Sequence, residues 1–295
     1  MPQTASLKLS ALNVVLLNDS WHAPEHYKSL FKELAALAQP VPIRGEQYLE
    51  MDSHLRQSRG TQVLEGTLHR FTAIEAMNWY NIEKHRRASD TERKKIQVPP
   101  NIAANYREIP FAFDLESHSF VFVTRSNRSL VSAVQVQKFM TQLAAYPAIF
   151  KIYGTVVASV EQDEEQLDKI LESESIRMLR ITVNRPNESF RKYDEALYER
   201  LRKMGARSDT EEFHADDEAA LKPDEEARNK AKAAISNGQV DAKVLIDGLV
   251  AEVSTMDKPL QERVRYDAKK ESLQQAFLRG FRSLLGRIAR DKVGE

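Results

Sequence analysis

Three residues of this chain have the types and order of a metal-dependent nuclease site. Pro223 and Asp224 precede Asp241, Ala242 and Lys243, and in such sites two carboxylates hold a divalent cation while the lysine assists the attacking water or the transition state. The local sequence argues against catalysis, because a proline followed by acidic residues is typical of a helix amino terminus. We expect no catalytic residues, and keep as an alternative a nuclease in which Asp224, Asp241 and Lys243 act with Mg²⁺ or Mn²⁺.

Two other spacings have simpler explanations than chemistry. His22 and His26 are four residues apart, but Pro24 lies between them, so we do not expect them to share a helix face as metal ligands. Ser189 and Lys192 have the Ser-x-x-Lys spacing of some acylating enzymes, yet no partner motif follows and Ser189 fits a helix cap. The sequence also contains no Gly-rich phosphate loop and no cysteine, which excludes a disulfide framework and a Cys-rich zinc site.

The clearest periodic pattern lies between residues 269 and 290, where we predict an amphipathic helix. Its apolar residues recur at intervals of three or four and form one stripe: Leu273, Phe277, Phe281, Leu284 and Ile288. The opposite face carries Arg279, Arg282, Arg287 and Arg290. Because a guanidinium group matches phosphate oxygens, this face is a candidate nucleic-acid-binding ridge. The alternatives are a solvated outer face and a membrane-surface contact.

A second basic segment lies near three aromatic residues. The cations are His85, Arg86, Arg87, Arg93, Lys94 and Lys95, and the aromatic residues are Trp79, Tyr80 and Tyr106. Such a mixture can hold a phosphate backbone and stack bases, although a tryptophan at this place fits a core position as well. Residues 209–226 are strongly acidic. This acidic segment is predicted to face away from a bound polyanion or to mask its site.

The elements that must position these residues alternate in type along the chain. Strands are expected over residues 7–17, 62–74, 111–115, 120–124, 150–160, 176–183, 207–214, 240–246 and 249–253, and helices over 24–38, 131–146, 164–171, 189–204, 223–235 and 269–290. Residues 79–82 are expected to continue the sheet, and residues 86–106 to form a loop or a short helix. Asp247 and Gly248 favour a type I′ turn.

These elements predict an α+β fold, with mixed sheets covered by helices and a C-terminal amphipathic basic helix. A length of 295 residues favours two lobes, which we place at 1–105 and 106–295. The hydrophobic share of 42% is enough for a core. No apolar run is long enough for a membrane span, and the start of the chain lacks the pattern of a signal peptide. We therefore expect a cytoplasmic protein without membrane insertion.

Short motifs between residues 61 and 260 resemble an uncharacterised bacterial family of unknown function, some members of which occur near anti-phage genes. They are Gly66-Thr67-Leu68, Trp79-Tyr80-Asn81, Phe111-Ala112-Phe113-Asp114, Arg185-Pro186-Asn187, Asn237-Gly238 and Pro259-Leu260. The family often has acidic residues after Arg-Pro-Asn, where this chain has Glu188-Ser189-Phe190. The order of elements also resembles RexA-type phage exclusion proteins, which are DNA-binding dimers. These resemblances imply a defence context and nucleic-acid binding, and neither supplies catalytic residues.

The sequence thus predicts a non-enzymatic nucleic-acid-binding protein of bacterial or phage defence, without a cofactor. We expect a homodimer that binds DNA rather than RNA and has a second defence-system protein as a further partner. The predicted contacts are Arg279, Arg282, Arg287, Arg290, Arg86, Arg87, Lys94 and Lys95. Binding through phosphates would be weakly sequence-specific and would fall steeply with salt. The alternatives are the metal-dependent nuclease and a protein-interaction subunit that binds no nucleic acid.

Overall fold

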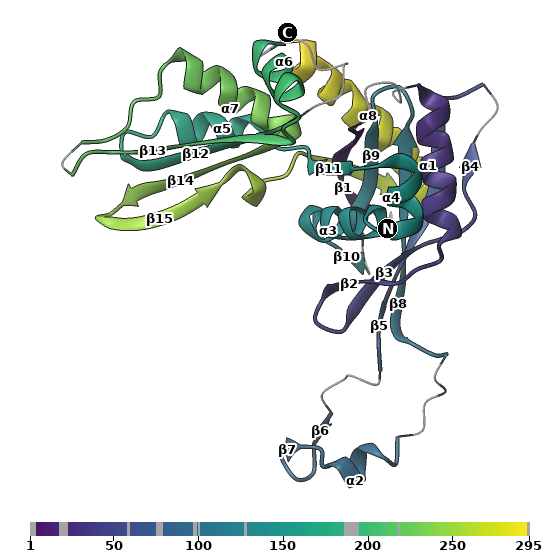
Figure 1. Cartoon of the computed structure of the whole chain (residues 1–295). Coiled ribbons are helices and arrows are strands. Elements are labelled where there is room, and N and C mark those ends of the chain that lie inside the picture. The colour runs from purple at the N-terminus through teal and green to yellow at the C-terminus, as the bar shows by residue number, and fades with distance from the viewer. Residues whose placement is uncertain are drawn as a thin grey trace.

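The computed structural model describes residues 4–17, 23–57, 60–74, 79–96, 99, 101–126, 129–185, 195–217 and 219–293. The described chain forms two lobes, each built on its own antiparallel sheet, and an arm that projects from the first lobe (Figure 1). The predicted α+β class is confirmed, with sheets covered by helices and a long helix near the C-terminus.

The first lobe contains a ten-stranded sheet in the order β11-β1-β9-β8-β5-β3-β2, in which β16, β10 and β4 pair with β1, β9 and β5, respectively. The long strand β1 pairs along one side with β9 and along the other with β16 and then β11. The strands are β1 (Thr4–Leu16), β2 (Val41–Arg44), β3 (Gln47–Met51), β4 (Arg56–Gln57), β5 (Val63–Thr72), β8 (Ala104–Asp114), β9 (Ser119–Ser126), β10 (Ser129–Leu130), β11 (Val156–Val160) and β16 (Gln261–Asp267).

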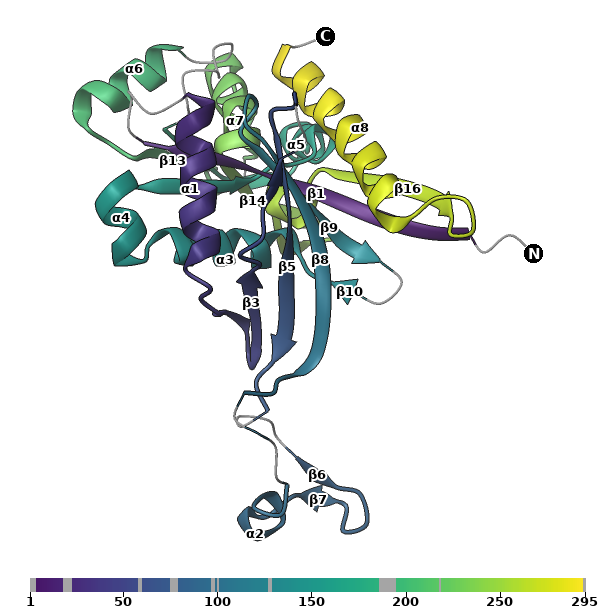
Figure 2. The same ribbon diagram turned by 90° about the vertical axis from the view of Figure 1, so that its right-hand side faces the viewer.

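Helices α1 (Pro24–Ala36), α3 (Ala133–Ala144) and α4 (Pro147–Tyr153) cover one face of this sheet (Figure 2). Helix α1 starts at Pro24, as predicted, but its N-cap is Ala23 without a side-chain cap bond, and residues 18–22 lie outside the described residues. Its Tyr27 stacks on His118, and its Phe31 stacks on Phe113. These rings are fully or almost fully buried, so aromatic packing fixes α1 on the sheet.

The C-terminal helix α8 (Leu273–Val293) lies on the opposite face, against β1 and β16 (Figure 2). The predicted apolar stripe is buried from Phe277 to Ile288, while Leu273 at the start of the helix is 38% exposed. Gly280 allows the close approach, because an added Cβ would lie 2.5 Å from Cγ2 of Val264 and 3.2 Å from Cδ1 of Leu9. The stripe therefore docks the helix on the body, as the periodicity predicts.

The second lobe has a four-stranded sheet in the order β13-β12-β14-β15. Its elements are α5 (Glu164–Leu171), β12 (Ile176–Asn184), α6 (Glu195–Met204), β13 (Ser208–His214), α7 (Glu225–Asn237), β14 (Gly238–Ile246), β15 (Leu249–Ser254) and a short 3-10 helix (Thr255–Asp257). The three α-helices share one hydrophobic cluster with the inner face of the sheet. At the predicted hairpin turn, Asp247 and Gly248 have φ values of 51° and 78°, which fits the type I′ geometry.

The division between the lobes differs from the predicted one near residue 105. Asn105 lies within β8, which pairs with β5 in the same sheet. One hydrophobic cluster combines residues 7–160 with residues 260–288, and the other spans residues 167–253. The first lobe therefore contains both ends of the described chain, because β16 returns to β1 and brings α8 with it.

The arm is an extension of the β5–β8 ribbon that carries residues 73–103 (Figure 1). At its tip, β6 (Tyr80–Asn81) pairs with β7 (Arg86–Arg87), and α2 (Asp90–Arg93) follows. The expectation that residues 79–82 continue the main sheet is therefore wrong. None of the described residues from 79 to 107 is buried. The described residues of the tip therefore form no core of their own.

Candidate nucleic-acid interface

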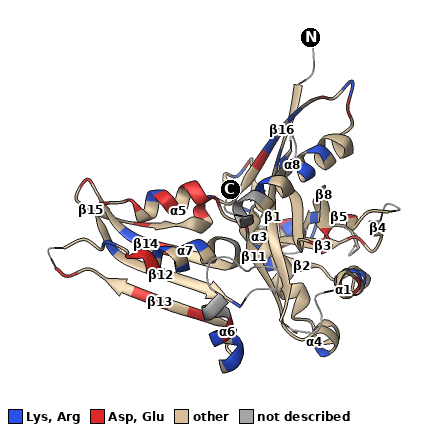
Figure 3. Cartoon of the chain, turned by 90° about the horizontal axis from the view of Figure 1, so that it is seen from above, with Lys and Arg blue, Asp and Glu red and all other residues tan. Residues whose placement is uncertain are grey.

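The arginines predicted to form a ridge on α8 are partly neutralised by the protein itself. Arg279 donates to Glu271 at 2.8 Å and to the backbone carbonyl of Arg265, and this pairing raises the pKa of Arg279 and lowers that of Glu271. Arg287 donates to the carbonyl of Gln261 at 2.7 Å and lies 3.4 Å from Glu262. Figure 3 shows basic positions of α8 beside acidic positions of β16.

Of the other two ridge residues, Arg282 is exposed and makes no ion pair within the described chain. The side chain of Arg290 lies outside the described residues. Helix α8 therefore does not offer the row of four available guanidinium groups that the sequence predicts. The reason is that Glu262 on β16 comes beside the helix in the folded chain, and Glu271, two residues before the helix, pairs with Arg279.

The arm tip keeps more of its positive charge available. Glu92 accepts from Lys84 at 2.9 Å and from Arg86 at 3.1 Å. The backbone N–H of Ser89 and the Lys84 ammonium hold the pKa of Glu92 well below its usual range. Arg93 pairs with Asp90. The remaining predicted cations are exposed and have no ion pair among the described residues; they are Arg87, Lys94 and Lys95.

Aromatic side chains accompany these cations along the arm. Tyr80 at the tip is 60% exposed, and Tyr106 on β8 is 48% exposed. The hydroxyl of Tyr106 is 2.8 Å from Nδ1 of His69, whose ring stacks on the tyrosine ring. Trp79 is partly buried. The arm and its base therefore carry exposed aromatic rings together with cations that no carboxylate of the described chain neutralises.

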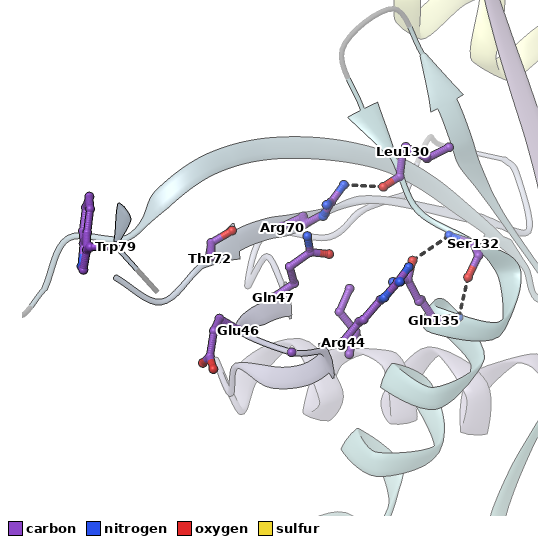
Figure 4. A pocket seen from close by; sticks show the side chains of 11 residues that line it. Arg44, Glu46, Gln47, Arg70, Thr72, Trp79, Leu130, Ser132 and Gln135 are labelled. Carbon is purple, nitrogen blue, oxygen red and sulfur yellow. Dashed lines mark hydrogen bonds between the residues drawn. The ribbon is translucent and has the colours of Figure 1, made fainter. Parts of the chain in front are cut away.

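A pocket of about 900 Å³ lies where the arm meets the body. This arm-base pocket is lined by Ile43, Arg44, Gly45, Glu46, Gln47, Arg70, Thr72, Trp79, Leu130, Ser132 and Gln135 (Figure 4). Arg70 of β5 donates to the backbone carbonyl of Leu130. Burial and the neighbouring Arg107 lower the pKa of Arg70. Sequence reasoning missed the pair Arg44 and Arg70, because no motif links two arginines that meet only through the β2-β3-β5 strand order.

The three residues of the nuclease alternative are not brought together. Asp224 is the N-cap of α7 and accepts from the backbone N–H of Ala227 at 2.9 Å. Helix α7 covers the inner face of the second sheet. Asp241 and Lys243 instead line a pocket on the other face, where Asp241 accepts from the side chain of Ser254 at 2.7 Å and Lys243 lies 3.5 Å from Glu252.

Metal binding gains no support from the geometry of the described residues. Among them, no group of three or more His, Asp or Glu side chains is arranged to hold a metal ion. His26 lies in α1, and His22 falls outside the described residues. The Asp224 cap is the helix-terminus role that its sequence context favours.

The acidic segment has partners inside the second lobe. Lys230 of α7 donates to Asp209 and to Glu211, at 2.8 Å each, and Arg180 of β12 donates to Glu212. The second lobe, whose strand β13 carries these acids, and the arm tip extend away from the first lobe in different directions (Figure 1). Within one chain, the acidic strand therefore does not cover the tip.

Comparison with known families assigns the chain almost from end to end. Residues 5–282 match the family described as Domain of unknown function (DUF4747). The chain belongs to this family. DUF4747 membership confirms the resemblance to a family of unknown function, while the anti-phage association and the likeness to RexA-type proteins remain predictions. No curated protein matches this DUF4747 chain. None of its described helices is both long and apolar enough to cross a membrane.

Proposed function

We propose that this DUF4747 protein is a non-enzymatic nucleic-acid-binding protein that uses its arm. The observation that carries the proposal is the contrast between two predicted basic surfaces. On α8, Arg279 and Arg287 contact the protein's own carboxylates. On the arm tip, Arg87, Lys94 and Lys95 are exposed and have no ion pair within the described chain. Unneutralised cations release counterions from a nucleic acid most effectively.

The arrangement favours single-stranded nucleic acid. The ring of Tyr80 is available to stack on a base, and a base offers its face only where it is not already stacked in a duplex. The cations contact phosphates, which carry no sequence information. The proposal is therefore weakly specific binding, with DNA as the expected ligand and with a strong dependence on salt.

Fluorescence anisotropy with labelled single-stranded DNA, duplex DNA and RNA tests this proposal. The tip variant changes Arg87, Lys94 and Lys95 together to Gln, and the matched control changes Arg279, Arg282 and Arg287 together to Gln. We expect the tip variant to lower affinity at least about tenfold and to reduce the slope of log K against log salt by about 0.7 to 0.9 per removed contact. The α8 variant should bind like the unchanged protein. Wild-type affinity in the tip variant would overturn the proposal.

Two parts of the hypothesis concern the assembly and its biological role. A homodimer would present two arms to one strand and so strengthen weak single contacts; light scattering of the purified protein measures its mass in solution.

A defence role requires that the tip variant lose protection of a bacterial host, which phage plating measures against the α8 control. If no nucleic acid binds even at low salt, the alternative of a protein-interaction subunit is favoured.

A nuclease remains distinguishable from a binding protein in the same experiments. If the protein were a nuclease, addition of Mg²⁺ or Mn²⁺ would produce cleavage products, and Asp241→Ala would abolish cleavage while nucleic-acid binding persists. Our proposal predicts intact nucleic acid with either metal, because Asp241 is held by Gln239 and Ser254 and Asp224 caps a helix on the other side of the sheet.

A further inference from the structure

We infer that the arm-base pocket binds one phosphate group, carried by a nucleic-acid strand that runs from the arm to the body or by a free nucleotide. Binding of a phosphate in a nucleic-acid strand rests on the proposed function, whereas binding of a free nucleotide does not. It starts from two arginines that line one pocket from different elements, Arg44 at the end of β2 and Arg70 on β5. Neither makes an ion pair with a carboxylate of the described chain.

The backbone aims the two guanidinium groups into the same space. Arg44 precedes Gly45, whose φ of 52° closes the turn between β2 and β3. Arg70 is anchored by its bond to the carbonyl of Leu130. A guanidinium has five N–H donors, so this anchor orients Arg70 and leaves donors for a ligand. In Figure 4 both groups extend toward the α3 end of the pocket, and the carboxylate of Glu46 points away from them.

The local electrostatics call for an anion. Arg70 and Arg107 are register partners on β5 and β8. Burial lowers the pKa of Arg70, and the charge of the neighbouring Arg107 lowers it further. A bound phosphate would relieve this repulsion and would accept two parallel bonds from a guanidinium fork.

Helix α3 adds to this field at the same end of the pocket. Its N-cap Ser132 and its third residue Gln135 both line the pocket and bond to each other in a capping box. The positive end of the helix dipole therefore lies at the wall of the same pocket as the two arginines. The capping box already uses the backbone N–H groups of Ser132 and Gln135, so the arginines supply the direct contacts.

The size of the pocket indicates what the phosphate is attached to. A volume of about 900 Å³ exceeds the needs of one phosphate group, and the lining reaches Trp79 at the start of the arm tip. Trp79 supplies an aromatic ring at the arm end of the pocket, and such a ring suits the base of a nucleotide whose phosphate is bound by the arginines. Both a nucleotide within a strand and a free nucleoside monophosphate join a phosphate group to a base in this way.

Isothermal titration calorimetry tests the inference with four probes: inorganic phosphate, adenosine monophosphate, and a short DNA strand with and without a 5′ phosphate. The variants are Arg44→Gln, Arg70→Gln and the double change. The control is Arg56→Gln, which removes an exposed arginine of β4 outside the pocket. We expect the double variant to weaken binding of phosphate-bearing probes at least about tenfold, as for lost charge-assisted hydrogen bonds, and Arg56→Gln to change nothing.

The probes separate the two sources of phosphate. Tight binding of the monophosphate favours a free nucleotide, and selective binding of the strands favours nucleic acid. Arg44 is exposed at the end of β2. The Arg44→Gln variant should therefore fold and test phosphate binding even if Arg70→Gln does not fold. The inference is overturned if unchanged protein binds none of the probes, or if Arg44→Gln and the double variant bind all of them with wild-type affinity. The tip variant should keep its affinity for the monophosphate, so failure of the arm proposal and failure of the pocket are distinguishable.

Discussion

The side-chain amide of Asn13 on β1 donates to the side-chain carbonyl of Asn237 at the end of α7, at 2.9 Å. Both residues are fully buried, and they belong to different lobes. Beside them, Gln162 donates to the backbone carbonyl of Gly238 at 2.6 Å. The joint between the lobes is therefore polar and specific, since each buried amide needs its partner in place.

Asn237→Ala removes the acceptor of the Asn13 amide and should lower the free energy of unfolding by about 1 to 3 kcal/mol, the usual cost of a buried polar group left without its partner. Urea denaturation followed by circular dichroism measures the change. Asn101→Ala, at an exposed position, should stay within about 0.5 kcal/mol. Equal stability of Asn237→Ala and the unchanged protein would show that the joint does not depend on this bond.

Two glycines of α8 should respond in opposite ways to alanine. At Gly280 the new Cβ would lie 2.5 Å from Val264 and 3.2 Å from Leu9, so the clash should cost about 1 to 3 kcal/mol and outweigh the better helix propensity. At Gly286 the new Cβ would meet no atom within 4 Å apart from the backbone of its own helix and its chain neighbours, so Gly286→Ala should stabilise the protein by about 0.5 to 1 kcal/mol. Thermal denaturation of both variants measures the signs, and stabilisation by Gly280→Ala would refute the close packing of α8.

Lys230 should be important for the stability of the second lobe. Its side chain is only 10% exposed. Burial lowers its pKa, but the hydrogen bonds to Asp209 and Glu211 more than offset this effect and raise it. Lys230→Met leaves the two carboxylates without their shared cation. Because both acids are partly exposed, we expect a loss of about 1 to 3 kcal/mol, below the cost of breaking a fully buried pair.

Chemical denaturation checks this value against Lys232→Met, which changes an exposed residue of the same helix. The control should stay within about 0.5 kcal/mol. A control that is as destabilised as Lys230→Met would mean that helix propensity, and not the ion pairs, accounts for the loss.

Asp52 should make stability depend on pH in the acid range. The backbone N–H of His54, and then the side chains of His54 and His69, lower the pKa of Asp52 from its ordinary value of 3.8. A carboxyl group with a lowered pKa in the folded state contributes stability above its unfolded pKa and loses it as the pH falls through the folded value. Asp52→Asn should therefore be less stable at pH 7, and the difference should shrink below about pH 4.

Urea midpoints at several pH values measure this dependence. Asp168→Asn is the control, because Asp168 is exposed on α5 and its side chain makes no ion pair within the described chain. A gap between Asp52→Asn and the unchanged protein that stays constant down to pH 3 would contradict the assignment.

The sequence by itself determined the features that depend on neighbours in the chain. The stripe from Phe277 to Ile288 required only helical periodicity, and it is buried as predicted. The turn at Asp247 and Gly248 could be predicted from the turn preference of these two residues alone. The cap at Asp224 could be predicted from the preference of a helix amino terminus for a capping acid. The strand predicted over residues 150–160 begins only at Val156, because Pro147 starts a short helix. Strands β2, β3 and β16 were not predicted, since their short patterns are weak.

Only the tertiary structure decided which charges are available and where the lobes divide. Arg279 and Arg287 had the spacing of an open ridge, but the carboxylates of Glu271 and Glu262 lie beside them in the fold. The return of β16 to β1 put both ends of the described chain into one lobe. The same strand order placed Arg44 and Arg70 around one pocket. Local preferences act over a few residues, whereas sheet pairing joins segments that are distant in the sequence. The electrostatic field at a site is the sum of the charges that such pairing brings together, so it depends on the tertiary structure.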